Sequence, residues 1–214
     1  MYVPDAFAET DRGTLCDFIR STGWGYLVGV ADGVPFVTHL PFLLEGDAGS
    51  ERLVAHMARA NPHWQGFTDG AGAREQLVVF SGPHAYVSPR WYTAAKAVPT
   101  WNYTAVHVYG VPRIVADPAA VYEAQKRLVD FYEAGADAPW RMEDVDAGYI
   151  EGMLRAIVSF EIPIARMEGK FKLSQNRTPE DRAGVIAALA DGSDEGGKRV
   201  ARLMASREAG LVSR

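Results

Sequence analysis

The sequence predicts a mainly β protein of α+β class, in which strands form a barrel and helices pack against its outside. Short segments rich in Val, Leu and aromatic residues follow one another between residues 26 and 115, and Gly and Pro separate them. The chain has no GxGxxG or GxxxxGKS/T motif, the glycine-rich turns with which doubly wound folds bind nucleotides. A barrel is therefore favoured, and a nucleotide-like ligand has to be held in another way.

Hydrophobic periodicity and turn residues place the elements. Leu15, Phe18 and Ile19 fall at helical spacing, which predicts an amphipathic helix from Asp11 to Ser21. We expect one compact domain at residues 1–176 and a helical C-terminal extension at residues 177–214. The expected strands are Tyr26–Ala31 and Phe36–Leu44, joined by the turn Asp32-Gly33, then Leu53–Met57, Gln76–Phe80, Asn102–Val115 and Ala156–Ala165; the later helices start after Asp117-Pro118, near Gly148, at Thr178 and after Asp194.

Composition limits the function classes. No apolar run approaches the roughly 20 residues that span a bilayer, and Met1 to Thr10 lacks the features of a signal peptide, so we expect a cytoplasmic protein without a membrane partner. The single cysteine, Cys16, excludes disulfides within one chain. The net charge of -5 opposes nonspecific DNA binding, which leaves only a small basic patch on a late helix: Lys198, Arg199, Arg202 and Arg207.

A strand-like run, Lys170-Phe171-Lys172-Leu173-Ser174, indicates an anion site. At the strand period of two, Lys170, Lys172 and Ser174 share one face while the two apolar residues share the other. The alternative is a solvent-facing edge strand, where lysines prevent aggregation.

A second anion site is expected near Arg59. Asn61 is a good N-cap and Pro62 a good first helical residue, so a helix should begin there with exposed N–H groups. A guanidinium beside that helix end suits a phosphate. The alternative is a surface arginine next to an ordinary cap, but together with the two lysines it favours a phosphate pocket.

Aromatic residues are densest in GPHAYVSPRWY, residues 82–92, and in VPTWNYTAVH, residues 98–107. Trp101 and Asn102 are candidates to line a slot for a flat ring, although aromatic side chains also serve as core or interface residues. In a regular strand Asn102 and Thr104 face away from Trp101 and Tyr103.

The five histidines and the serines indicate no catalytic or metal site. No HExxH spacing and no GxSxG elbow is present, so structural histidines and no metal are expected. A single histidine as haem ligand stays open.

Several motifs in order resemble the PaiB-like family of FMN-binding negative transcriptional regulators: HLP at 39–41, ARANPHW at 58–64, GPHAYVSPRWY, VPTWNY and KLSQNR at 172–177. The resemblance covers nearly the whole chain. It implies an FMN-binding split barrel, usually a homodimer with flavin at the subunit interface, and a repressor role.

The resemblance also implies cofactor-binding residues. His39, Leu40 and Pro41 would run beside the flavin, and His56, Ala58, Arg59 and Asn61 would lie near the ribityl phosphate. Lys170, Lys172, Ser174 and Gln175 would complete the site. Three functions compete: an FMN-binding regulator, an FMN-dependent oxidoreductase, and a haem-binding or haem-degrading protein of related fold. No residue is an obvious proton donor, which favours binding over catalysis.

Overall fold

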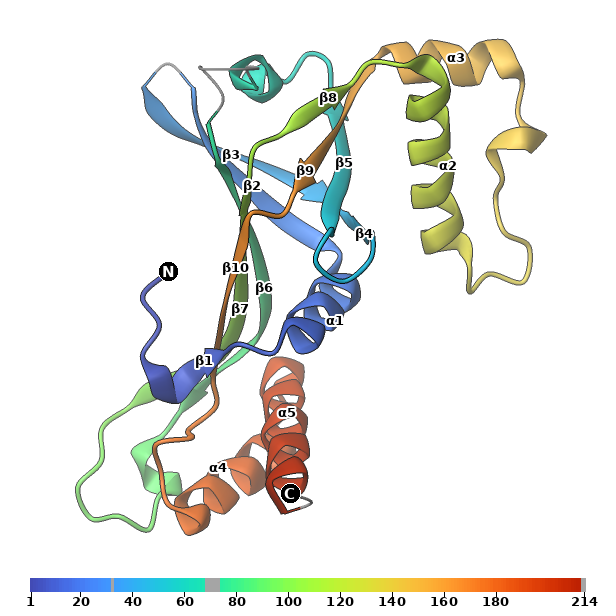
Figure 1. Cartoon of the computed structure of the whole chain (residues 1–214). Helices are drawn as coiled ribbons and strands as arrows, with labels where there is room; N and C mark the ends of the chain where they lie inside the picture. The colour runs from blue at the N-terminus through green and yellow to red at the C-terminus, as the bar shows by residue number, and fades with distance from the viewer. Residues whose placement is uncertain (32, 68–73, 213–214) are drawn as a thin grey trace. The chain divides into compact units, whose positions relative to one another are not determined.

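The computed structural model describes residues 1–31, 33–67 and 74–212, so the predicted turn residue Asp32 lies outside the described residues. Within these ranges runs of consecutive strands are followed by pairs of helices, and both sheets are antiparallel, which confirms the predicted α+β class. The strands in Figure 1 are β1 (Ala8–Glu9), β2 (Trp24–Ala31), β3 (Val34–Pro41), β4 (Leu43–Glu45), β5 (Arg52–Ala58), β6 (Gln76–Val87), β7 (Thr100–Gly110), β8 (Arg113–Val115), β9 (Ile157–Pro163) and β10 (Arg166–Lys172). The helices are α1 (Arg12–Thr22), α2 (Pro118–Glu133), α3 (Ala147–Arg155), α4 (Pro179–Asp191) and α5 (Glu195–Val212).

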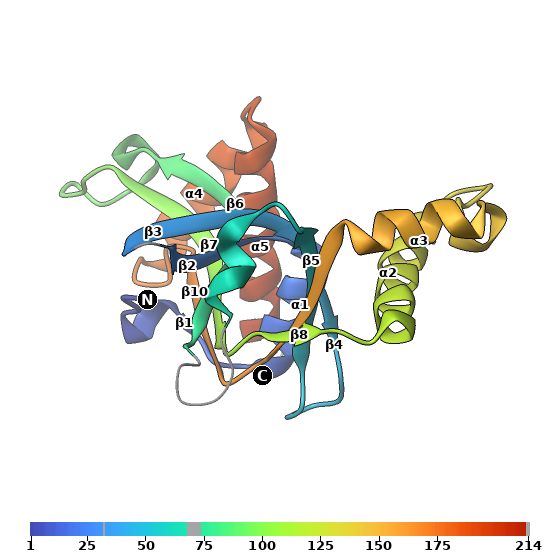
Figure 2. The ribbon, with the colours of Figure 1, turned by 90° about the horizontal axis from the view of Figure 1, so that it is seen from above.

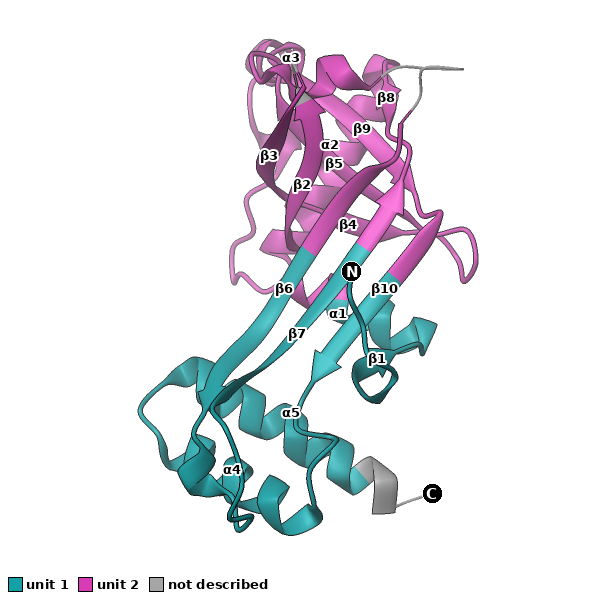
Figure 3. Ribbon diagram, turned by 90° about the vertical axis from the view of Figure 1, so that its left-hand side faces the viewer, with its two compact units in different colours: residues 1–18, 80–107, 168–214 teal, residues 19–79, 108–167 magenta. Residues whose placement is uncertain are grey.

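The chain divides into two compact units, which Figure 3 shows in two colours. Unit 1 comprises residues 1–18, 80–107 and 168–214, and unit 2 comprises residues 19–79 and 108–167. Strands β6, β7 and β10 and helix α1 contribute residues to both units. Helices α4 and α5 belong to unit 1, as does the part of β10 from Glu168 onward. The predicted domain boundary at residue 176 stays a prediction.

Unit 1 contains a sheet in the order β1-β10-β7-β6. Strand β1 pairs with β10 through Ala8 opposite Lys170, so β10 has a partner on each side over this short stretch rather than a free edge. One face of the sheet is buried and carries Phe171, whose ring lies 5.3 Å from that of Phe18 in α1. Helix α5 adds Met204 to the same core.

The C-terminal helices begin where the sequence predicts. Thr178 caps α4 by accepting a hydrogen bond from the Asp181 N–H, and Pro179 occupies the first helical position. Helices α4 and α5 contact each other and bury Val185 and Val200. A Cβ atom at Gly184 would lie 2.2 Å from the Trp91 carbonyl oxygen, so α4 needs a glycine to approach that loop.

Unit 2 contains the hairpin β2–β3, to which β6 adds on the β2 side, and a second sheet in the order β4-β5-β9-β8. Apolar residues at alternate positions of these strands form its core, because a strand with one buried face places every second side chain inward. The fully buried ones include Leu27, Leu53, Met57, Val78, Phe160 and Ile162.

Helix α3 lies across the N-terminal end of α2 in Figure 1. The Asp117 carboxylate caps α2 by accepting from the Ala120 N–H at 2.9 Å, as the Asp-Pro sequence predicts. Ala124 and Leu128 of α2 pack against Leu43 and Val54 of the second sheet. No helix in the described part of the chain is both long and apolar enough to cross a membrane.

Three predicted strands differ in length from the observed ones. The segment Phe36–Leu44 is interrupted at Phe42, and Asn102–Val115 is interrupted at Val111-Pro112, where proline has no N–H to donate. Strand β6 continues past Phe80 to Val87 through Gly82-Pro83, which sequence reasoning treats as a stop. A Cβ at Gly82 would lie 2.2 Å from Thr104 Oγ1, so glycine here permits close packing within the sheet.

Candidate anion-binding site

Two lysines of β10 lie close to the start of β7 and belong to a cationic cluster in unit 1. Lys172 Nζ donates to Thr100 Oγ1 at 2.6 Å and to the Trp101 carbonyl oxygen. Lys170 Nζ donates to the Tyr2 carbonyl oxygen at 3.1 Å and lies 5.3 Å from each of the Tyr2 and Tyr103 ring centres. Both ammonium groups therefore bond only to neutral oxygen atoms, and neither has an ion pair with a described residue.

Arg177 is the third cation of this cluster, and sequence reasoning did not include it among the site residues. Its guanidinium carbon lies 4.5 Å from the Tyr92 ring centre. Burial lowers the pKa of Lys172 below its usual value of 10.5, and the positive charges of Lys170 and Arg177 lower it further. An anion bound next to Lys172 would offset this destabilisation of its charged form. We call Lys170, Lys172 and Arg177 the unit 1 cation cluster.

Ser174 is not on the face of the two lysines, and this part of the prediction is wrong. Strand β10 ends at Lys172, and Ser174 has φ of 64°, a left-handed conformation uncommon outside glycine. The serine thereby turns inward and lies against Asn102, a fully buried residue that also contacts Met204 of α5. The strict alternation assumed from the sequence holds only as far as the strand continues.

Asn102 and Ser174 hold the strand ends together rather than offering free polar groups. Asn102 Nδ2 donates to Ser174 Oγ at 2.9 Å, and neither side chain is more than 4% exposed. Asn102 and Thr104 are buried while Trp101 is 53% exposed, which confirms that the polar pair faces away from the aromatic residues.

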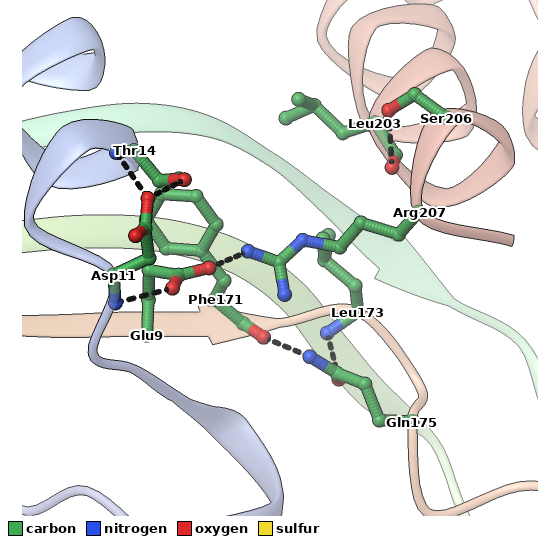
Figure 4. Close-up of polar contacts among 9 residues, drawn as sticks. All are labelled: Glu9, Asp11, Thr14, Phe171, Leu173, Gln175, Leu203, Ser206 and Arg207. Atoms are coloured by element: carbon green, nitrogen blue, oxygen red, sulfur yellow. Dashed lines mark hydrogen bonds and ion pairs between the residues drawn. The ribbon is translucent and has the colours of Figure 1, made fainter. Parts of the chain in front are cut away.

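The side-chain amide of Gln175 is used within its own turn. Its Nε2 donates to the Phe171 carbonyl oxygen, and its Oε1 accepts from the Leu173 N–H at 2.7 Å, as Figure 4 shows. Close by, Arg207 of α5 pairs with Glu9 and stacks on Phe171 at 4.8 Å. Gln175 thus shapes the turn that follows Lys172.

Exposed aromatic side chains share the face of the two lysines. Trp101 of β7 lies 6.0 Å from Tyr86 and 6.2 Å from His84 of β6, measured between ring centres. Tyr86 is 44% exposed. One face of the unit 1 sheet therefore combines flat rings with the partly buried Lys172 and with Lys170, which is buried against Tyr2 and Tyr103, and the opposite face is core.

Arg59 in unit 2 has a different environment. Its Nε donates to the Arg155 carbonyl oxygen at 2.8 Å and its Nη2 to the Ile157 carbonyl oxygen at 2.7 Å. The guanidinium thus joins the end of β5 to the junction of α3 and β9, and the Arg59 residue is exposed. Trp64 Nε1 donates to the Arg59 carbonyl oxygen at 2.9 Å and holds this segment in place.

Asn61 is the predicted cap, but the helix after it is short. Its side chain accepts from the His63 N–H at 3.0 Å, and Pro62 occupies the first position. The segment Pro62–Gly66 is a five-residue 3-10 helix. So short a helix provides little of the positive end charge on which the phosphate argument at this helix start depends.

The other predicted site residues of unit 2 lie on two strands. On β3, His39 is exposed with its ring 4.9 Å from that of Tyr26, whereas Leu40 is buried and offers only its backbone. On β5, Ala58 is exposed and His56 is half-buried. Burial lowers the pKa of His56, and its Nδ1 has no hydrogen-bond partner.

The histidines give no metal site within the described ranges, where no group of three or more His, Cys, Asp or Glu side chains is placed to hold an ion. His63 is buried, and its Nδ1 lies 2.8 Å from Thr38 Oγ1. Burial lowers the pKa of His63, so it is a structural histidine that stays neutral.

Antiparallel sheets with flanking helices are the architecture of the split-barrel class of α+β proteins. A family model described as "Putative FMN-binding domain" matches residues 1–166, and this chain belongs to that family. A relative from Bacillus subtilis, "Protease synthase and sporulation protein PAI 2", is 33% identical over 204 residues, which cover 95% of this chain and 96% of the relative. The resemblance to PaiB-like proteins is confirmed.

Solved structures confirm the split-barrel fold. The flavocytochrome Anf3 from Azotobacter vinelandii matches 83% of this chain and 75% of its own with a TM-score of 0.58 at 22% identity. The FAD and heme binding protein from Mycobacterium smegmatis matches 82% of this chain and 78% of its own with a TM-score of 0.55 at 18% identity. At such identities the likeness shows the fold alone.

Proposed function

We propose that this chain binds FMN, with the phosphate on the unit 1 cation cluster and the ring system against the exposed aromatic residues of the same face. The observation that carries the proposal is the cluster itself: Lys170, Lys172 and Arg177 have no ion pair with a described residue. A phosphate dianion offers these donors charged acceptors in place of neutral ones. Family membership points to the same ligand.

The residues present fit this cofactor. Trp101 and Tyr86 offer ring faces and edges to a flat ring, and FMN, when bound, supplies redox chemistry that amino acids lack. The turn that follows Lys172 is held in place by hydrogen bonds of Asn102, Ser174 and Gln175. These three residues therefore support the cluster without contacting the phosphate. The unit 2 residues His39, Pro41, His56 and Ala58 remain expected flavin contacts on the basis of the family resemblance.

For the role of the flavin, we propose regulation, in a cytoplasmic homodimer. The name of the Bacillus relative supports a part in controlling protease synthesis and sporulation. The basic patch on α5 is smaller than its sequence indicates, since Arg207 pairs with Glu9 and Lys198 pairs with Glu195. Two exposed arginines, Arg199 and Arg202, are left for DNA. Regulation by strong, direct binding to DNA therefore has less support than regulation by another route.

Titration of the purified chain with FMN tests the cofactor. Lys172→Ala should weaken FMN binding by about 1.5 to 3 kcal/mol, the range for hydrogen bonds to charged groups. Lys198→Ala on α5 is the matched control and should leave the affinity unchanged. A colourless protein that takes up no FMN, or equal affinity in both variants, contradicts the proposal.

Two further measurements separate regulation from catalysis. An FMN-dependent oxidoreductase would have its bound flavin bleached by NADH or NADPH, and this alternative is favoured if bleaching is rapid. A DNA complex that disappears at modest salt reflects nonspecific phosphate contact, whereas one that survives supports a repressor. Sedimentation analysis tests the homodimer, and a monomer at micromolar concentration would contradict it.

A further inference from the structure

Unit 2 contains a groove that is lined by none of the flavin contacts proposed above. Its volume is about 640 Å³. It is bounded by the first turns of α2, the last turn of α3 and the strands β8 and β9, all within one unit. We call it the α2–α3 groove, after the two helices that Figures 1 and 2 show next to each other. Pockets of 300 to 1,000 Å³ are typical of small-molecule sites.

The walls of the groove are largely apolar. Ile114 and Val115 of β8, Val121 and Tyr122 of α2, and Leu154 of α3 line it. Ile114 is 42% exposed although it lies next to these apolar neighbours. An apolar ligand body would remove this surface from water, which is favourable at about 25 cal/mol per Å².

A buried hydroxyl group without a partner lies in the same groove. Ser159 of β9 is 2% exposed, and its Oγ has no hydrogen-bond partner. The strand register places it opposite Val115 on β8 and opposite His56 on β5, so the three side chains share one face of the sheet. An unsatisfied buried hydroxyl costs about 1 to 3 kcal/mol, and a polar ligand group would satisfy it.

Two guanidinium groups and one carboxylate give the groove a net positive charge. Arg155 is 73% exposed in its side chain, and its nearest carboxylate oxygen, on Glu151, is 3.7 Å away, a weak pair. Arg59 also lines the groove, and two of its donors are taken by backbone carbonyl groups. Arg155 is therefore the cation free to bind an acidic group.

We propose that the α2–α3 groove binds a small organic acid with an apolar body and a single carboxylate or sulfonate. The apolar body lies on the walls formed by β8 and α2, the acidic group pairs with Arg155, and the Ser159 hydroxyl donates a hydrogen bond to a ligand oxygen. This site lies within unit 2, and none of its lining residues belongs to the unit 1 cation cluster. In the proposed regulatory function, a protein with these two sites responds both to a cofactor and to a second class of metabolite.

The probe for this proposal is 8-anilinonaphthalene-1-sulfonate, which is apolar, carries one sulfonate and fluoresces on leaving water. Ala119→Trp introduces a large side chain into the groove, because Ala119 lines it at the exposed start of α2. It should weaken probe binding by at least about tenfold, or 1.4 kcal/mol. Ala120→Trp is the matched control: Ala120 is its exposed neighbour outside the groove, and probe binding should be unchanged.

The charge requirement has its own test. Arg155→Gln should weaken probe binding by about two- to fivefold, as expected for an exposed ion pair. Decanoate should displace the probe from the natural chain at lower concentration than decanol, which has the same apolar tail and no charge. Thermal melts of all variants verify that each is folded before the comparison.

Two results would overturn the proposal. The first is equal probe binding in Ala119→Trp and Ala120→Trp. The second is displacement of the probe by FMN together with loss of FMN uptake in Ala119→Trp, which would make the groove part of the flavin site. Failure of FMN to bind anywhere leaves the probe experiment interpretable, because it needs no flavin.

Discussion

The two regions predicted to bind phosphate use their cations in opposite ways. In unit 1, Lys172 is partly buried, has neutral acceptors only, and has a lowered pKa because other cations are near it. In unit 2, Arg59 gives two donors to the carbonyl groups of Arg155 and Ile157 and ties three segments together. The difference teaches that a basic residue in a promising motif is a binding candidate only when its donors lack better structural acceptors.

The largest expected effect is a pH dependence of FMN affinity, which tests whether the charge of Lys172 in unit 1 binds the phosphate. The folded-state pKa of Lys172 lies below 10.5, so the free protein loses this proton as pH rises through the lowered value. FMN affinity should then fall by up to about tenfold per pH unit, since one proton is linked to binding. Titrations at increasing alkaline pH measure it, and Lys172→Ala should flatten the slope. An equal slope in the variant would assign the dependence to another group.

Ser174→Ala tests the support beneath the cation cluster. Removing the hydroxyl leaves the buried Asn102 amide without its partner, so the free energy of unfolding should fall by about 1 to 3 kcal/mol. Urea denaturation measures this, with the exposed Ser193→Ala as control. If Ser174→Ala is as stable as the control, the pair does not hold the strand ends together.

Arg59→Ala tests the structural reading of unit 2. Loss of two hydrogen bonds from an exposed guanidinium should lower the free energy of unfolding by about 1 to 2 kcal/mol. FMN affinity should change less than in Lys172→Ala. The control is Arg113→Ala, an exposed arginine on β8. A normal stability together with a larger loss of FMN affinity would reverse the comparison and place the phosphate at Arg59.

The smallest expected effect is a loss of stability in mild acid from His56. Burial lowers its folded-state pKa, so the unfolded chain binds a proton at a higher pH than the folded chain. Stability is therefore complete above pH 6.5 and falls as pH drops below it. For one histidine that stays neutral in the fold, the loss between pH 6.5 and 6.0 is about 0.4 kcal/mol. Stability curves of the natural chain and His56→Gln should differ by this amount, and parallel curves would contradict the assignment.

Some site features followed from local sequence. Asn61 and Pro62 predict their cap, and Thr178 and Pro179 predict theirs, because a cap depends only on residues within one turn. The burial of Asn102 behind the exposed Trp101 follows from strand alternation. The family resemblance supplied the expectation of FMN and the split-barrel fold as a whole.

Other features needed distant partners. Ser174 departs from the face of Lys172 because its positive φ lets it reach Asn102, 72 residues earlier in the chain. Arg59 has a structural role because Arg155 at the end of α3 and Ile157 at the start of β9 offer it carbonyl oxygens 96 and 98 residues away. No periodicity within either segment carries this information.

The sequence alone determined the α+β class, where most strands and helices begin, and the family, because these depend on local patterns and on motif order. Tertiary structure decided which cations are free to bind an anion, which polar groups are spent on the fold, and where a groove forms between α2, α3 and the sheet. Those properties depend on which groups from distant segments come into hydrogen-bonding distance, and folding of the whole chain sets that distance.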